Sequence, residues 1–128
     1  VTFAAGKDHP EIARLMQESA VVVLPSRGET LGMVLVEALA CGTPVVATRS
    51  GGPQDIVTDE VGLLTPVTDP EALADAIAFV VDNRKKFDPQ RLRAVAMAKF
   101  SGAVVAEQYL TLYARAFAAH RARGERNT

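Results

Sequence analysis

The length and composition of the chain fit one ordinary globular domain. Its 128 residues are 48% hydrophobic and 23% charged, and a chain of this length buries roughly two-thirds of the surface exposed when it is unfolded. A net charge of −1 argues against a nucleic-acid groove or a polybasic membrane surface. The sequence has a single cysteine, no signal-peptide pattern and no apolar span of about 18 residues. These features favour a soluble, cytoplasmic protein.

The first elements in chain order are a strand and a helix. Residues 1–5 are mostly apolar and predict a strand with an open edge. Pro10, followed by Glu11 in the first turn, is typical of a helix start. The inward face of this helix consists of the apolar residues Ile12, Leu15 and Met16, followed by Ser19.

A strand, a loop, a helix and a second strand follow. Residues 21–24 are short, apolar and stopped by Pro25, as in a buried parallel strand. The next apolar residues have helical spacing, and the helix should end at Gly42 and Pro44. They are Leu31, Val34, Leu35, Ala38 and Leu39. Residues 45–48 predict the next strand. This connection is right-handed and puts the loop at the carboxyl end of the first strand.

The rest of the chain continues in the same style. Residues 50–53 predict a turn into a short helix, and residues 62–64 a fourth strand. Asp69-Pro70 and Asp88-Pro89 are two further helix starts. A long helix should cover about residues 101–121, with two adjacent apolar rows, before a polar tail at 122–128. The sequence therefore predicts an α/β fold: a Rossmann-like, three-layer parallel sheet of about four strands.

The loop after residues 21–24 carries the strongest chemical signal. Backbone N–H groups at a helix start suit a phosphate, and Gly32, expected in the first helical turn, would let a ligand come close. Glu29 and Glu37 would lie about 10 Å apart along a helix. Two carboxylates would repel phosphate, so they are better suited to hydroxyl groups on either side of a diphosphate. A nucleotide sugar has this layout.

Several motifs occur here in a characteristic order. They are Pro25-Ser26, Glu29 and Glu37 with Leu31-Gly32 between them, the run from Glu37 to Val46, Gly51-Gly52, Gly62-Leu63-Leu64 and the run from Asp69 to Leu73. With these motifs the chain resembles the retaining, nucleotide-sugar-dependent glycosyltransferases of family 4, which have the two-domain GT-B architecture. The resemblance covers nearly the whole chain. Many relatives carry Phe where this chain has Leu31, which should affect packing more than chemistry.

The resemblance implies a role for the whole chain. Residues 1–128 would be a partial nucleotide-sugar-binding domain, half of the carboxyl-terminal domain of a hexosyltransferase, and inactive alone. Its partners would be a UDP- or GDP-sugar donor and an N-terminal domain of the same enzyme, with no cofactor, no metal and no nucleic acid. A peripheral membrane contact of the parent enzyme stays open.

The resemblance also implies roles for individual residues. Glu29, the catalytic candidate, would contact the donor sugar hydroxyls, and Glu37 would hold the ribose. The amides of Thr30, Leu31 and Gly32 would lie near the diphosphate. Ser26 and Gly28 complete the donor-binding candidates.

Structural alternatives remain for each candidate. Both glutamates could be surface charges, Gly28 and Gly32 turn or packing residues, and Ser26 a partner for the loop backbone. Arg27 is typical of a solvated loop charge, and Cys41 of a packed core residue. Two other functions also remain: a GT-B-fold nucleotide-sugar epimerase, and a non-catalytic module that forms a homodimer through the edge strand at residues 1–5.

Overall fold

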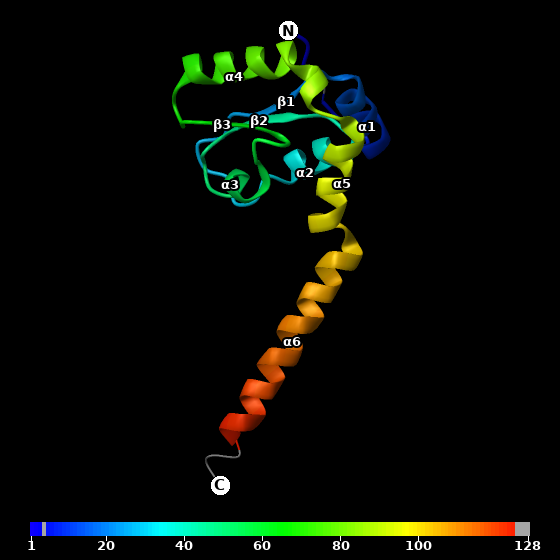
Figure 1. Ribbon diagram of the computed structural model, residues 1–128, viewed down its shortest axis with the longest axis vertical. Helices are drawn as coiled ribbons and strands as arrows, with labels where there is room; N and C mark the ends of the chain where they lie inside the picture. Colours follow the sequence, from blue (N-terminus) through cyan, green and yellow to red (C-terminus); the bar gives the residue numbers. More distant parts are fainter. Residues whose placement is uncertain (4, 125–128) are drawn as a thin grey trace. The chain divides into compact units, whose positions relative to one another are not determined.

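The computed structural model describes residues 1–3 and 5–124, and the chain divides into two compact units, residues 1–96 and 97–128. The first unit is built on a parallel sheet (Figure 1). Its strands within the described residues are β1 (Val22–Leu24), β2 (Val45–Thr48) and β3 (Gly62–Thr65), in the order β1-β2-β3. Val23 pairs with Val46, and Val46 pairs with Leu63. The α/β class with a parallel sheet is therefore confirmed.

Helices cover both faces of this sheet. Helix α4 packs on β2 and β3, whereas α2 packs on β1 and β2 from the opposite face (Figure 1). The helices α1 and α3 contact α2. The bounds are α1 His9–Glu18, α2 Met33–Ala40, α3 Pro53–Ile56, α4 Pro70–Asp82, a 3₁₀ turn at Arg84–Lys86, α5 Pro89–Phe100 and α6 Gly102–Gly124.

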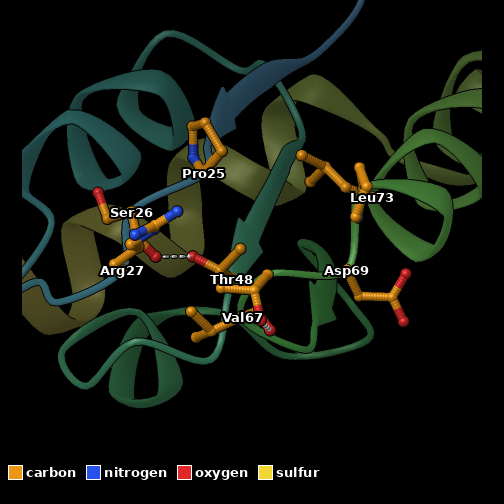
Figure 2. Close-up of a pocket in the computed structure, with 9 residues that line it drawn as sticks. Pro25, Ser26, Arg27, Thr48, Val67, Asp69 and Leu73 are labelled. Carbon is orange, nitrogen blue, oxygen red and sulfur yellow. Dashed lines mark hydrogen bonds between the residues drawn. The ribbon is translucent and has the colours of Figure 1, made fainter.

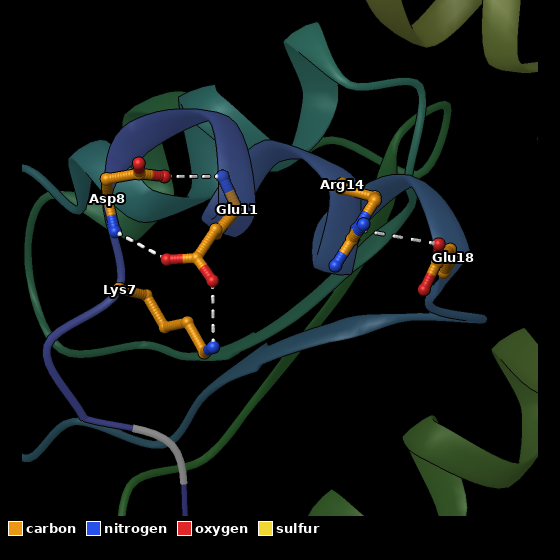
Figure 3. Close-up of polar contacts among 5 residues, drawn as sticks. All are labelled: Lys7, Asp8, Glu11, Arg14 and Glu18. Carbon is orange, nitrogen blue, oxygen red and sulfur yellow. Dashed lines mark hydrogen bonds and ion pairs between the residues drawn. The ribbon is translucent and has the colours of Figure 1, made fainter.

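The expected start signals open α1 and α4. Asp8 accepts a hydrogen bond from the Glu11 amide, and the Glu11 side chain accepts one from the Asp8 amide, which completes a capping box (Figure 3). Asp69 caps α4 by accepting from the Ala72 amide at 2.9 Å. Each helix therefore begins where its side chains satisfy the first unpaired amides.

The core lies between α2, β2 and α4. All four residues of β2 are buried. Leu35 and Leu39 of α2 and Val80 of α4 are fully buried with them. A strand buried on both faces is the expected centre of a parallel sheet.

The strand expected at residues 1–5 is wrong. Val1–Phe3 and Ala5 form no strand, and Ala4 lies outside the described residues. A strand exists only through its ladder hydrogen bonds, and these residues have no neighbouring strand to pair with. The described part of the sheet therefore has three strands instead of about four. The edge-strand homodimer loses its stated basis, because no such edge strand forms.

Two helix boundaries also differ from expectation. Helix α2 begins at Met33, so Leu31 lies before it and is 41% exposed, outside the core face. Helix α6 runs to Gly124, so residues 122–124 of the expected tail are helical, and residues 125–128 lie outside the described part. Several apolar residues of α6 are exposed: Tyr109, Leu110, Leu112, Tyr113 and Phe117. Among the described helices, none has both the length and the apolar character needed to cross a bilayer.

Candidate functional site

Two loops at the carboxyl edge of the sheet are joined backbone to backbone. One is the β1–α2 loop, residues 25–32, and the other is the β2–α3 turn, residues 49–52. The Glu29 amide donates to the Ser50 carbonyl at 2.9 Å, and the Gly52 amide donates to the Glu29 carbonyl at 2.8 Å. Glu29 and Gly51 form an isolated parallel bridge. The backbone of Glu29 is thus held on both its N–H and its C=O.

This close approach explains Gly51 and Gly52. Gly51 has a φ of +118°, which favours glycine, and a Cβ there would lie 2.7 Å from the Glu29 carbonyl oxygen. A Cβ on Gly52 would lie only 2.4 Å from Leu31 Cα. Both glycines therefore serve the contact between the loops, beyond making a tight turn.

Thr48 ties the start of the same loop to the sheet. Its hydroxyl donates to the Ser26 carbonyl (Figure 2). The same hydroxyl lies 3.5 Å from the Leu24 carbonyl. Thr48 is 5% exposed, so this hydroxyl needs an internal partner. The sequence interpretation did not single out Thr48. The available signal was a hydroxyl at the carboxyl end of an otherwise apolar strand.

Gly32 has a different structural role from the expected one. It precedes α2 as its N-cap, with a φ of +87°, and does not belong to the first helical turn. A Cβ there would lie 3.3 Å from the side chains of Leu24 and Leu35. The missing side chain is therefore explained by the left-handed backbone and by packing against the core. Its contact with a donor stays a prediction.

The three amides proposed for the diphosphate differ in their pairing and burial. Among the described residues, the amides of Thr30 and Gly32 donate to no acceptor. The Leu31 amide makes a long contact, 3.4 Å, with the Glu29 carboxylate. Thr30 and Leu31 are exposed, whereas Gly32 is buried. Of the three, only Thr30 combines an unpaired amide with an exposed residue, and an unpaired amide before a helix is suited to an anion.

The two glutamates lie on different elements. Glu29 is half-buried in the loop, and Glu37 is exposed on α2. Because α2 starts at Met33, helical rise applies only from there and cannot give the distance between them. Glu37 lies one turn inside the helix. Gly28 is exposed and Ser26 is half-buried in the same loop.

A hollow of about 290 Å³ opens beside this loop (Figure 2). Ser26, Arg27 and Thr48 line it from the sheet side, and Asp69 and Leu73 from the start of α4. Within the described part of the chain, Glu29 and Glu37 are not among its lining residues. The hollow therefore brings Ser26 and Arg27 together with Asp69, but it does not unite the two glutamates.

The other candidate groups do not form a site. In the residues that the structure describes, no three His, Cys, Asp or Glu side chains are grouped to hold a metal ion. Cys41 is half-buried just after α2, and its carbonyl oxygen accepts from the Arg93 guanidinium at 3.4 Å. Cys41 is therefore only partly packed and is not the buried core residue that was expected.

Sequence relatives are glycosyltransferases that are much longer than this chain. A D-inositol 3-phosphate glycosyltransferase of Catenulispora acidiphila is 47% identical over 88 residues, covering 68% of this chain and 20% of the relative. That of Mycolicibacterium smegmatis is 38% identical over 127 residues, covering 98% of this chain and 29% of the relative. The chain thus spans less than a third of the length of these relatives.

Solved structures show the same fold. Sucrose-phosphate synthase from Thermosynechococcus elongatus is 37% identical with a TM-score of 0.81, covering 92% of this chain and 30% of that one. Anabaena HepE in complex with UDP-glucose is 29% identical with a TM-score of 0.72, covering 82% of this chain and 30% of that one. The three-stranded parallel sheet and its helices are therefore similar to part of known glycosyltransferase structures.

The family model described as "Glycosyl transferases group 1" matches residues 1–99. This match includes the whole sheet, both loops at its carboxyl edge, and α1 to α4. The chain belongs to the glycosyl transferases group 1 family.

Proposed function

We propose that this chain is the donor-binding part of a retaining, family 4 hexosyltransferase, which moves a sugar from a nucleotide sugar to an acceptor. One observation carries the proposal: the β1–α2 loop, at the carboxyl edge of a parallel sheet, has an unpaired amide on the exposed residue Thr30, next to Glu29 in the loop and before Glu37 on α2. Ligands of open α/β sheets bind at this edge. The solved structures of HepE with UDP and with UDP-glucose support a nucleotide-sugar donor.

Different residues bind different parts of the donor. The amides of Thr30, Leu31 and Gly32 approach the diphosphate, whose charge grows as it leaves, and stabilise it without a metal ion. Glu29 accepts hydrogen bonds from the hexose hydroxyls, and Glu37 accepts them from the ribose. Ser26 and Gly28 complete the surface around the donor.

The acceptor site belongs to another part of the enzyme. The curated relatives are more than three times longer than the matched region, so an N-terminal domain has room to bind the acceptor. The chain alone should bind the donor weakly and transfer no sugar. We further propose that the enzyme works in the cytoplasm, where nucleotide sugars are the donors.

Titration calorimetry tests the donor site. We expect the wild-type chain to bind UDP-glucose or GDP-mannose, and Glu37→Ala to bind it about tenfold more weakly, because a charged hydrogen bond is worth roughly 1.5–3 kcal/mol. Glu107→Ala is the matched control, since Glu107 is an exposed glutamate on α6. Equal heats for wild type and Glu37→Ala would remove Glu37 from the site.

A second assay separates transfer from epimerisation. The full-length enzyme is incubated with the donor alone and with donor and acceptor. Transfer requires the acceptor. Conversion of the donor to its epimer without any acceptor would refute the transferase proposal.

A further inference from the structure

We infer that the β2–α3 turn, and Gly52 above all, is a positioning element that sets the geometry of the donor-binding loop. This inference rests on the proposed function of Glu29 and Leu31. It adds a residue that touches no ligand in the proposal and acts only through its neighbours.

The two loops are held together along their length. The Thr48 hydroxyl donates a hydrogen bond to the Ser26 carbonyl. The Ser50 carbonyl accepts one from the Glu29 amide, and the Gly52 amide donates one to the Glu29 carbonyl. These contacts come from one short segment and reach consecutive parts of the other loop. Residues 48–52 therefore fix the position of the β1–α2 loop backbone through these hydrogen bonds.

Gly52 is the glycine of this segment at which an added Cβ would come closest to the other loop. Its φ of −47° is accessible to any residue, so backbone conformation does not require glycine there. Space does. A Cβ on Gly52 would lie 2.6 Å from both the Leu31 nitrogen and the Leu31 oxygen. Since these are backbone atoms, no side-chain rotation can relieve the overlap.

Any side chain at position 52 must therefore displace the Leu31 peptide. Leu31 carries one of the amides proposed for the diphosphate, and Glu29 beside it is proposed for the hexose. Glu37 lies on α2, and the three atoms nearest to a Cβ on Gly52 all belong to Leu31, which lies before this helix. Displacement should weaken the hexose and diphosphate contacts and leave the ribose contact intact.

The experiment compares two ligands on three variants of the chain. Gly52→Ala adds the Cβ, Thr48→Val removes only the hydroxyl, and Gly102→Ala is a matched control because a Cβ there meets nothing within 4 Å. Dissociation constants for UDP-glucose and for UMP are measured by NMR titration of the ¹⁵N-labelled chain. Ligand-free spectra and thermal unfolding report whether each variant folds.

We expect Gly52→Ala to bind UDP-glucose about tenfold more weakly, as for the loss of one charged hydrogen bond, while UMP binding changes less than about twofold. Thr48→Val should also weaken UDP-glucose binding more than UMP binding, but by a smaller factor than Gly52→Ala. If Gly52→Ala does not fold, the result for Thr48→Val tests the inference. Gly102→Ala should match wild type.

Three results would overturn the inference, and they are distinguishable. Wild-type dissociation constants for both ligands in the folded variants would refute positioning and leave the proposed function standing. An equal loss of both ligands would indicate a merely structural role. Failure of the wild-type chain to bind UDP-glucose at millimolar concentration would overturn the proposed function, and the positioning role would fall with it.

Discussion

The sheet unit and helix α6 both contain many apolar residues but differ in how deeply these are buried. In the sheet unit, Leu39 is fully buried, and a Cβ on Gly62 would overlap the backbone of Val45. In α6, Leu110 is 70% exposed and Gly102 has free space around its Cα. Substituting the same residue type should therefore change the free energy of unfolding by different amounts in the two regions. Only the tertiary contacts reveal this difference. Substituting the same residue type in both regions tests this difference.

The largest effect is expected for glycine. A Cβ on Gly62 would lie 1.8 Å from the Val45 carbonyl oxygen, inside the β2–β3 ladder. Gly62→Ala should therefore separate the two strands and remove most of the free energy of unfolding, which is about 5–15 kcal/mol in ordinary domains. Circular dichroism and NMR dispersion should show an unfolded or molten chain.

Gly102→Ala is the counterpart in α6. Alanine has a higher helix propensity than glycine, so this variant should be as stable as wild type or slightly more stable. A folded Gly62→Ala variant with wild-type stability would contradict the close approach of β2 and β3.

A leucine pair sharpens the same comparison. Leu39→Ala should lower the free energy of unfolding by about 2–5 kcal/mol, because it leaves a cavity among fully buried side chains. Leu110→Ala should change it by less than about 0.5 kcal/mol, since Leu110 is exposed. Urea denaturation of both variants gives the two values. Equal losses would show that α6 is packed in solution.

The smallest effect concerns the surface of the sheet unit. The Lys7 ammonium and the Asp8 amide hold the pKa of Glu11 below its ordinary value (Figure 3). A lowered pKa in the folded state stabilises the fold above the unfolded pKa, and this stabilisation is lost as the pH falls through the folded pKa. Glu11→Gln should therefore be slightly less stable than wild type near neutral pH.

Acidification should erase that difference, because both proteins then carry a neutral side chain at position 11. Thermal unfolding in neutral and in strongly acidic buffer measures it. Glu18→Gln is the control, since Glu18 is also on α1 but lies 3.9 Å from the Arg14 Nε. A difference that persists in acid would show that the contribution of Glu11 is not electrostatic.

Local patterns were sufficient for most of the fold. Asp69 and Pro70 predicted the start of α4, and the apolar run before Pro25 predicted β1, because capping and burial are decided within a few residues. The pattern failed at residues 1–5. A short apolar run cannot supply the neighbouring strand that a ladder requires.

The residues of the candidate site stay a prediction, and their geometry could not be derived from the sequence. Glu29, Glu37 and the loop between them were recognisable from residue order. The position of Gly32 before α2, and not within it, could not be predicted, because its left-handed backbone depends on how the loop packs against Leu24 and Leu35. The hydroxyl of Thr48 acquired its role only when the Ser26 carbonyl came within reach.

The sequence by itself therefore determined the α/β class, the main helix starts and the loop that carries the candidate donor residues. These depend on interactions between residues that are close in the chain. Only the tertiary structure decided why Gly51 and Gly52 are glycines and how Glu29 is held. The reason is steric and long-range: the backbone of residues 29–31 lies against residues 50–52, some twenty positions further along the chain.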